Sequence, residues 1–549
     1  MLPAPGLSRK DPLMTHGMVC AAQPEAAEAG ADILRAGGNV VDAAIGAALV
    51  QTAVDPQMCG IAGMGCLHVY LPRQGVHTTI DFHGRAPAAT RPDMWQELIV
   101  REAEDGWGFI LQGRVNEIGY QAITTPMTLR AFDTALRRFG TRALAELLPA
   151  AIEYCEHGFL VRPHVSEFWH LPPTAGREAN IGMITRYPAT RKIYVKPDGH
   201  PYAVGEILRN PDMGRSYRRI AEHGAEDFYT GGIAVRIAAD MTEHGGLLSL
   251  ADLAACVPED NKPLWGTYRG YRIATNNPPG GGIQLIEMLN ILEHFDLRTI
   301  GHNTPEYIRV VSEAMKIATT DKDAKVGDPR FVPVPVAELC SKQYAARMAD
   351  RIARGDKTHV PRFNSGGFES KHTTQVCVMD ADGNAVTMTH TLGQPSGVVT
   401  DGLGFMYNGA MAVFDPRPGH AGSLEPGKAR FSALSPTIVF AGDAPFLVLG
   451  APGATYITMG NLQVMLNVME FGMDAQQAVC APRFAAVSNT IELSNRIARS
   501  AERDLQAHGY ATRRHAQSYT FAWVHAIRSV HGKLDGGADP ATGGMAVAV

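Results

Sequence analysis

The chain of 549 residues carries 50 basic and 55 acidic side chains, which gives a formal net charge of -5. Hydrophobic residues make up 45% of it and charged residues 19%, a globular rather than a disordered composition. A pI near 6.5 indicates no basic surface for nucleic acid. No apolar run reaches the roughly 18 residues that a transmembrane helix requires. We therefore expect neither nucleic acid nor a membrane as a partner.

The first 20 residues and the cysteines bear on the compartment. Residues 1–20 contain no apolar core of the kind that a signal peptide has. The eight cysteines form no CxxC pair, and no HExxH motif occurs, so the sequence suggests neither a zinc site nor a redox dithiol. We expect a cytoplasmic protein with buried, reduced cysteines and with no metal or organic cofactor.

Two helices are expected near the start of the chain. Pro24 suits a first helical turn, residues 26–36 carry an apolar stripe, and two glycines follow. Asn39 is then a good N-cap for a second, alanine-rich helix that must pack closely. Residues 60–65 are glycine-rich and precede a strand-like segment at 66–71. A dinucleotide fingerprint requires a strand before the glycines and a helix after them, so we expect a tight packing loop instead.

The remaining chain divides at about residue 354. Before it, helices are expected at 129–139, 143–157, 216–223, 232–244, 283–295 and 305–322. Residues 354–372 are polar and predict an exposed loop. Strand-like runs follow at 373–379, 385–391, 404–407, 437–440 and 445–449, then helices at 456–469 and 474–480. Residues 380–384 form a turn signal that predicts a hairpin of the first two strands. This order predicts an α+β protein with an αββα sandwich in the C-terminal third and a mostly helical N-terminal part.

Thr373 stands where the polar loop enters a strand. If the chain is cut between His372 and Thr373, the threonine becomes an N-terminal residue whose own α-amine can take the proton of its hydroxyl. The pKa of such an amine, roughly 8, lies usefully near neutrality. Judged by local sequence alone, the commoner interpretation is an ordinary β-branched residue that begins a strand.

Motifs along nearly the whole chain point in one direction. They lie at 36–44, 60–65, 85–87, 245–247, 268–271, 278–282, 327–329, 373–374, 380–384, 434–437 and 450–453. In combination they resemble the γ-glutamyltranspeptidase family of N-terminal nucleophile (Ntn) hydrolases. The resemblance implies a precursor that cleaves itself into a large subunit, residues 1–372, and a small one, residues 373–549. Both would build an αββα sandwich as a heterodimer, or as a dimer of heterodimers.

The resemblance also implies catalytic roles. Thr373 would attack an amide carbonyl to give an acyl-enzyme, which water or an acceptor amine then releases. Thr391 matches a second threonine whose hydroxyl supports the nucleophile. Gly453 and Ala454 match a glycine pair whose backbone N–H groups form an oxyanion hole. Ala454 departs in its side chain but keeps the amide donor, which is what such a hole needs.

The residues that would bind a γ-glutamyl group depart from the family pattern. The family binds the α-carboxylate with an arginine and two serines, and the α-ammonium with Asn, Gln and Asp. The six matching positions here hold His83, Ser432, Ala433, Gly393, Ala410 and Val413. Histidine cannot reproduce the bidentate contact of guanidinium. The loop at 416–431 is short and predicts no lid.

Nearby cations offer another anchor for an acid. They are Arg85, Arg417 and Arg430. The alternative interpretation of each is a solvated surface arginine with no role in binding. We therefore expect His83, Arg85, Arg430 and Ser432 to bind a small-molecule amide that is not a standard γ-glutamyl compound. A true γ-glutamyl transferase or glutathione hydrolase stays open, as does an unprocessed, inactive scaffold. The retention of Thr373, Thr391 and Gly453 together argues against the scaffold.

Overall fold

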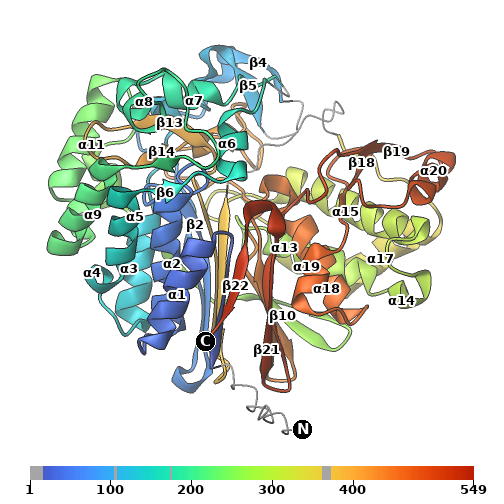
Figure 1. Cartoon of the computed structure of the whole chain (residues 1–549). Helices are drawn as coiled ribbons and strands as arrows, with labels where there is room; N and C mark the ends of the chain where they lie inside the picture. Colours follow the sequence, from blue (N-terminus) through green and yellow to red (C-terminus); the bar gives the residue numbers. More distant parts are fainter. Residues whose placement is uncertain (1–15, 104–107, 174–175, 362–372) are drawn as a thin grey trace, which may run out of the picture.

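Two antiparallel sheets stacked between helices form the centre of the computed structural model, which describes residues 16–103, 108–173, 176–361 and 373–549 (Figure 1). The seven-stranded sheet has the order β22 (Met545–Ala548), β1 (Gly17–Ala21), β11 (Thr374–Asp380), β12 (Ala385–Thr391), β2 (Met64–Leu71), β3 (Val76–Phe82), β8 (Glu259–Asn261). The six-stranded sheet has the order β21 (Lys533–Ala538), β20 (His525–Val530), β16 (Ala444–Gly450), β15 (Thr437–Ala441), β10 (Tyr271–Thr275), β9 (Leu264–Tyr268).

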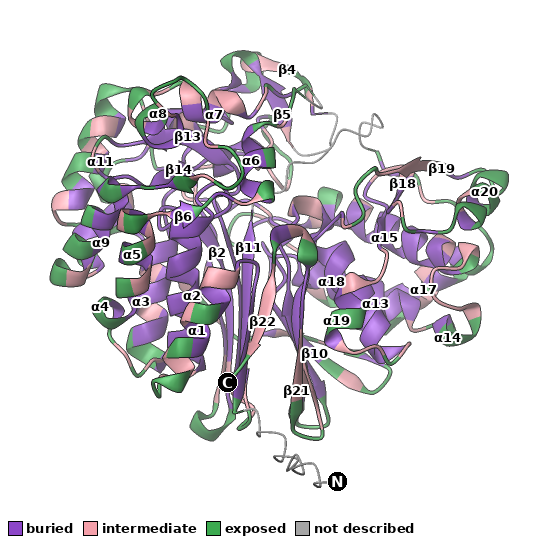
Figure 2. Cartoon of the chain, viewed as in Figure 1, coloured by how far each residue is buried: buried purple, intermediate pink, exposed green. Residues whose placement is uncertain are grey.

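Helices cover the outer face of each sheet (Figure 1). The seven-stranded sheet carries α1 (Pro24–Arg35), α2 (Val40–Val54) and α3 (Thr128–Phe139), and the six-stranded sheet carries α13 (Gly282–Leu292), α18 (Ile457–Met469) and α19 (Ala475–Cys480). Apolar side chains fill the space between the sheets, among them Met379, Ile438 and Val448. Figure 2 shows this interior as a continuous buried region. The αββα sandwich is present. Its strands β1, β2, β3, β8, β9 and β10 come from the N-terminal part, so the local sequence pattern, which placed the sandwich in the C-terminal third, was wrong on this point, whereas the family resemblance had both parts of the chain building it.

Local signals account for several element boundaries. The Asn39 side chain accepts from the N–H groups of Val41 and Asp42 at 2.9 and 3.0 Å, and Asp42 accepts from the Asn39 N–H, which closes a capping box at the start of α2. The helix expected at 143–157 is two helices, α4 (Leu144–Leu147) and α5 (Pro149–His157). Pro149 separates them because it lacks the N–H that a continuous helix needs.

The other elements surround this sandwich. In the N-terminal part they are β4 (Ile99–Glu102), β5 (Phe109–Leu111), β6 (Phe159–Leu160), α6 (Pro163–Trp169), α7 (Ile181–Thr185), α8 (Pro188–Tyr194), β7 (Ile207–Leu208), α9 (Pro211–His223), α10 (Glu226–Tyr229), α11 (Gly232–Glu243) and α12 (Leu250–Ala254). Later come α14 (Leu297–Ile300), α15 (Pro305–Lys325), α16 (Val336–Leu339), α17 (Lys342–Ala353), β13 (Pro395–Val399), β14 (Met406–Asn408), β17 (Phe484–Ala485), β18 (Thr490–Leu493), α20 (Arg499–Ala507) and β19 (Ala511–Arg514). In the described part of the chain, no helix has both the length and the apolar character to cross a bilayer.

Candidate active site

Thr373 lies directly before β11, at the end of the two central strands of the seven-stranded sheet. Because Thr374 pairs with His390, the register places Thr373 beside Thr391, the last residue of β12. The Thr373 hydroxyl donates to Thr391 Oγ1 at 3.1 Å, and the Gly393 N–H donates to the same oxygen at 2.8 Å. The structure thus brings together the two threonines that the sequence singled out. His372, the other side of the expected cleavage bond, lies outside the described residues.

The glycine-rich loop at 60–65 packs against the strand that carries Thr391. A Cβ atom on Gly63 would lie 2.4 Å from the Thr391 carbonyl oxygen, and one on Gly65 would lie 2.4 Å from the Thr389 carbonyl oxygen. Glycine is required at both positions because the two backbones approach this closely. The loop is a tight packing loop, as predicted, and it fixes the end of β12.

The turn between β16 and α18 holds the expected oxyanion-hole residues. Gly453 has a φ of 145°, and a Cβ atom there would lie 2.6 Å from the Ala522 Cα atom. Ala454 has a φ of 49°, which an alanine rarely adopts, and it lines the same cavity as Thr373. A strained turn just before a helix suits backbone N–H groups that stabilise an oxyanion.

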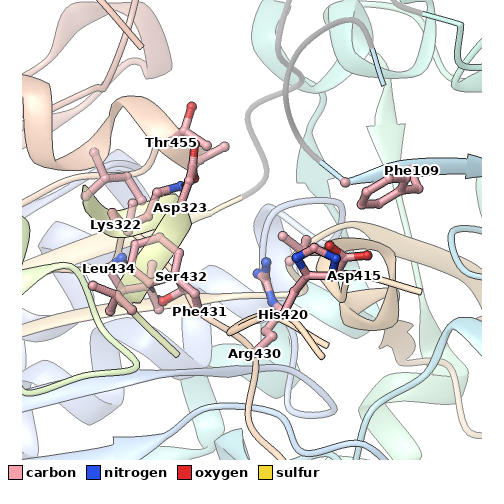
Figure 3. Close-up of a pocket in the computed structure, with 18 of the residues that line it drawn as sticks. Phe109, Lys322, Asp323, Asp415, His420, Arg430, Phe431, Ser432, Leu434 and Thr455 are labelled. Atoms are coloured by element: carbon pink, nitrogen blue, oxygen red, sulfur yellow. Dashed lines mark hydrogen bonds and ion pairs between the residues drawn. The ribbon is translucent and has the colours of Figure 1, made fainter. Parts of the chain in front are cut away.

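A cavity of about 310 Å³ opens beside the two threonines (Figure 3). Besides Thr373, Thr391, Gly393 and Ala454, its lining includes Phe109, Lys322, Asp323, Val413, Asp415, Arg417, His420, Arg430, Phe431, Ser432, Ala433, Leu434 and Thr455. Sequence reasoning missed Lys322, Asp323, His420 and Phe109, which carry no motif and reach the cavity through tertiary folding alone. Across the described ranges, no group of three or more His, Cys, Asp or Glu side chains is arranged to hold a metal ion.

Arg430 is a buried cation in this cavity. Its side chain is only 6% exposed, it forms no ion pair within the described chain, and its Nε atom has no hydrogen-bond partner there. Burial lowers the pKa of the Arg430 guanidinium to about 9, so the group is still charged at neutral pH. Arg417, by contrast, pairs with Asp415 at 2.7 Å. A buried charge without a counter-ion is unfavourable, and a bound anion would relieve that cost.

Gly393 connects Arg430 to the threonine pair. Gly393 has a φ of 69°, and a Cβ atom built on it would lie 3.2 Å from Arg430 Nη2. The guanidinium therefore reaches into the space that a larger side chain at position 393 would need. The same Gly393 donates its N–H to Thr391, so a single residue contacts both the cation and the threonine pair.

His83 does not line the cavity itself but contacts a residue that does. Its ring is buried, its Nδ1 atom lies 2.8 Å from Asp81 Oδ1, and its Nε2 atom hydrogen-bonds to Ser432 Oγ. Ser432 lines the cavity. The expectation that His83 binds substrate directly is therefore corrected, because Ser432 stands between the two.

Arg85 is also placed away from this cavity. Its guanidinium pairs with Glu259 Oε1 at 2.6 Å, and it lines a separate surface depression. Its backbone forms an isolated bridge with Ala429, the neighbour of Arg430. The structure thus places Arg85 outside the cavity that Thr373 lines, and its charge has a carboxylate partner there, which corrects the expectation that it anchors an acid beside Thr373.

Comparisons with known proteins indicate the family to which the chain belongs. The sequence profile described as gamma-glutamyltranspeptidase matches residues 26–549. An acylase ACY 1 proenzyme of Pseudomonas sp. (strain V22) is 36% identical over 499 residues, covering 90% of this chain and 87% of the relative. A glutathione hydrolase proenzyme of Escherichia coli (strain K12) is 33% identical over 485 residues, covering 85% of this chain and 80% of the relative. The crystal structure of a cephalosporin acylase from Bacillus halodurans has a TM-score of 0.85 and 28% identity, covering 100% of this chain and 98% of the acylase chain.

Proposed function

Because the chain belongs to the gamma-glutamyltranspeptidase family, and is therefore an enzyme of that hydrolase and transferase type, we propose that it is an autoprocessing amidohydrolase with Thr373 as nucleophile and an anionic acyl group as substrate. The proposed cleavage releases the Thr373 amine at the end of β11. Several relatives are named proenzymes, which supports processing of this kind.

The chemistry follows from the contacts of the two threonines. The freed α-amine takes the Thr373 hydroxyl proton while Oγ1 attacks the amide carbonyl carbon. Thr391, held by the Gly393 N–H, keeps Oγ1 in place, and the N–H groups at Gly453 and Ala454 stabilise the oxyanion. The C–N bond then breaks, the amine leaves with a proton, and water releases the acid from the ester.

The proposal of an anionic acyl group rests on the buried cation of Arg430 in the cavity. In the family pattern, position 393 holds an asparagine that binds the α-ammonium of a γ-glutamyl group. Here glycine stands at that position, and the Arg430 guanidinium lies against it. A substrate ammonium placed there would face a cation, whereas a carboxylate would neutralise it. Val413 and Ala433, also in the lining, offer no polar side-chain atom to an ammonium.

Three anilides that differ by one group each would test this proposal. We expect glutaryl anilide to have the highest kcat/KM. Butyryl anilide, which lacks the carboxylate, should be at least tenfold lower because it gains nothing from Arg430. γ-Glutamyl anilide differs from glutaryl anilide only by the α-ammonium and should also be at least tenfold lower. The proposal is wrong if γ-glutamyl anilide equals or exceeds glutaryl anilide.

A true glutathione hydrolase is the second candidate, and its support is the 33% identity to a relative of that name. The same three anilides distinguish it, because that enzyme would prefer the γ-glutamyl compound. An inactive scaffold would turn over none of them. The hydrogen-bonded pair of Thr373 and Thr391 argues against a scaffold, because an inactive scaffold would need neither hydroxyl.

A further inference from the structure

Asp81, His83 and Ser432 form a hydrogen-bonded series beside the substrate cavity. Asp81 belongs to β3, and its Oδ1 atom lies 2.8 Å from His83 Nδ1. The same oxygen accepts from the His83 backbone N–H at 2.9 Å, which fixes the histidine against the carboxylate. On its other side, His83 Nε2 hydrogen-bonds to Ser432 Oγ. The order is carboxylate, imidazole, hydroxyl.

The contact with Asp81 decides the direction of these hydrogen bonds. A carboxylate only accepts, so His83 Nδ1 carries the hydrogen and the neutral ring presents a lone pair at Nε2. The Ser432 hydroxyl then donates to Nε2. This is the relation of nucleophile, base and orienting acid that activates a serine, and such sites are recognised by geometry rather than by position in the chain.

Ser432 is placed where an electrophile could reach it. It lines the cavity that Thr373 also lines (Figure 3), whereas His83 is not part of that lining. Among the described residues, the other contact of its Oγ atom is a long one, 3.4 Å from the Leu434 backbone nitrogen. Arg430, two residues earlier, lines the same cavity with a guanidinium that forms no ion pair with the described residues, so it brings a positive charge to the space where an oxyanion on the substrate would form.

We propose that Ser432 is a second nucleophile of this protein, activated by His83 and Asp81 and reactive toward activated esters and fluorophosphonates. With an ester, Ser432 Oγ bonds to the carbonyl carbon as its proton passes to His83 Nε2. The alkoxide or phenoxide leaves and takes that proton, so His83 returns to its neutral form, and water then releases the acid. With a fluorophosphonate, the P–F bond breaks, fluoride leaves, and a stable phosphonyl ester remains on Ser432.

An alkyl fluorophosphonate provides the test, with the modified residue located by peptide mass spectrometry of the wild-type protein. We expect an adduct on Ser432. We expect none on Ser423, a buried serine whose hydroxyl donates to the Arg417 carbonyl and which has no imidazole partner in the described part of the chain. Ser432→Ala should lose the adduct. His83→Gln keeps a polar side chain but no base, and the rate of labelling at Ser432 should fall by about 10²-fold or more.

Two results would overturn the proposal. One is a wild-type protein labelled only at Thr373 or at neither residue. The other is a Ser432 labelling rate in His83→Gln within about threefold of the wild type. Asp81→Asn, which keeps the shape of the carboxylate, serves as the second variant if His83→Gln unfolds, and it should slow labelling by at least tenfold. Because the adduct is assigned to a residue, failure here is distinct from failure of Thr373 to hydrolyse amides.

Discussion

Replacing Arg430 with methionine removes a buried cation while keeping most of the side-chain volume. The change should act on one part of the substrate only, namely an acidic group on the acyl chain. In the free enzyme the guanidinium has no counter-ion within the described chain, so its loss should not lower the free energy of unfolding. Activity toward an acidic acyl group and stability should therefore respond in different ways.

The magnitude follows from the kind of contact that is lost. A hydrogen bond to a charged group contributes about 1.5–3 kcal/mol. At about 1.36 kcal/mol per factor of ten, Arg430→Met should lower kcat/KM for glutaryl anilide by about 10- to 150-fold. Butyryl anilide has no carboxylate, and its kcat/KM should stay within about threefold, because that is the size of a small packing change.

The assay compares the two anilides in the wild type, Arg430→Met and Arg85→Met. Arg85 is the matched control. The sequence made it a candidate anchor for the acid, as it did Arg430, but in the structure it pairs with Glu259 outside the cavity. Arg85→Met should leave the ratio of the two kcat/KM values unchanged. The reasoning would be refuted if Arg430→Met lowered both anilides equally, or if Arg85→Met lowered the glutaryl preference instead.

Two further predictions concern the proposed catalytic threonines and the stability in acid. Thr391→Val removes the hydroxyl that contacts Thr373 and leaves the Gly393 N–H without its acceptor. The kcat should therefore fall by about 10²-fold or more while the circular dichroism spectrum stays native. A near-normal kcat would show that Thr391 does not act in the site. Burial lowers the pKa of three histidines to about 3 from 6.5, namely His68, His390 and His525. The unfolded chain then binds more protons than the folded one below pH 6.5, so the free energy of unfolding should fall as pH drops from about 6.5 toward 3. Urea titrations should show a shallower fall for His390→Gln than for the wild type. An equally steep fall in the variant would contradict the low pKa of His390 in the folded protein.

Local patterns predicted helices and the central hairpin well. Asn39 as a cap, Pro24 in a first turn and the turn at 380–384 act over a few residues, so the sequence alone exposes them. Sheet order depends on pairing between distant segments, as where β1 pairs with both β11 and β22. No local signal encodes that pairing, which is why, apart from the segment at 66–71, local patterns did not indicate the N-terminal strands of the sandwich.

The site divides in the same way. Thr373, Thr391 and the turn at Gly453 followed from motifs, and the structure brings the two threonines into contact. The roles of the arginines did not, because the sequence does not tell which arginine meets a carboxylate. Arg85 meets Glu259, whereas Arg430 meets none in the described chain, and only the tertiary structure separates them. The contact of His83 with Ser432 spans 349 positions and was equally invisible.

The central claim is that Thr373 is a nucleophile released by self-cleavage, and the intact mass of the purified protein tests it most directly. The Thr373 hydroxyl should attack the preceding carbonyl, and the resulting ester should hydrolyse. The account predicts two chains, the smaller consisting of residues 373–549 with Thr373 at its N-terminus, and a single chain of 59.1 kDa for Thr373→Ala. A wild-type protein that stays full length while it hydrolyses amides, or a small chain that begins at another residue, would contradict the account.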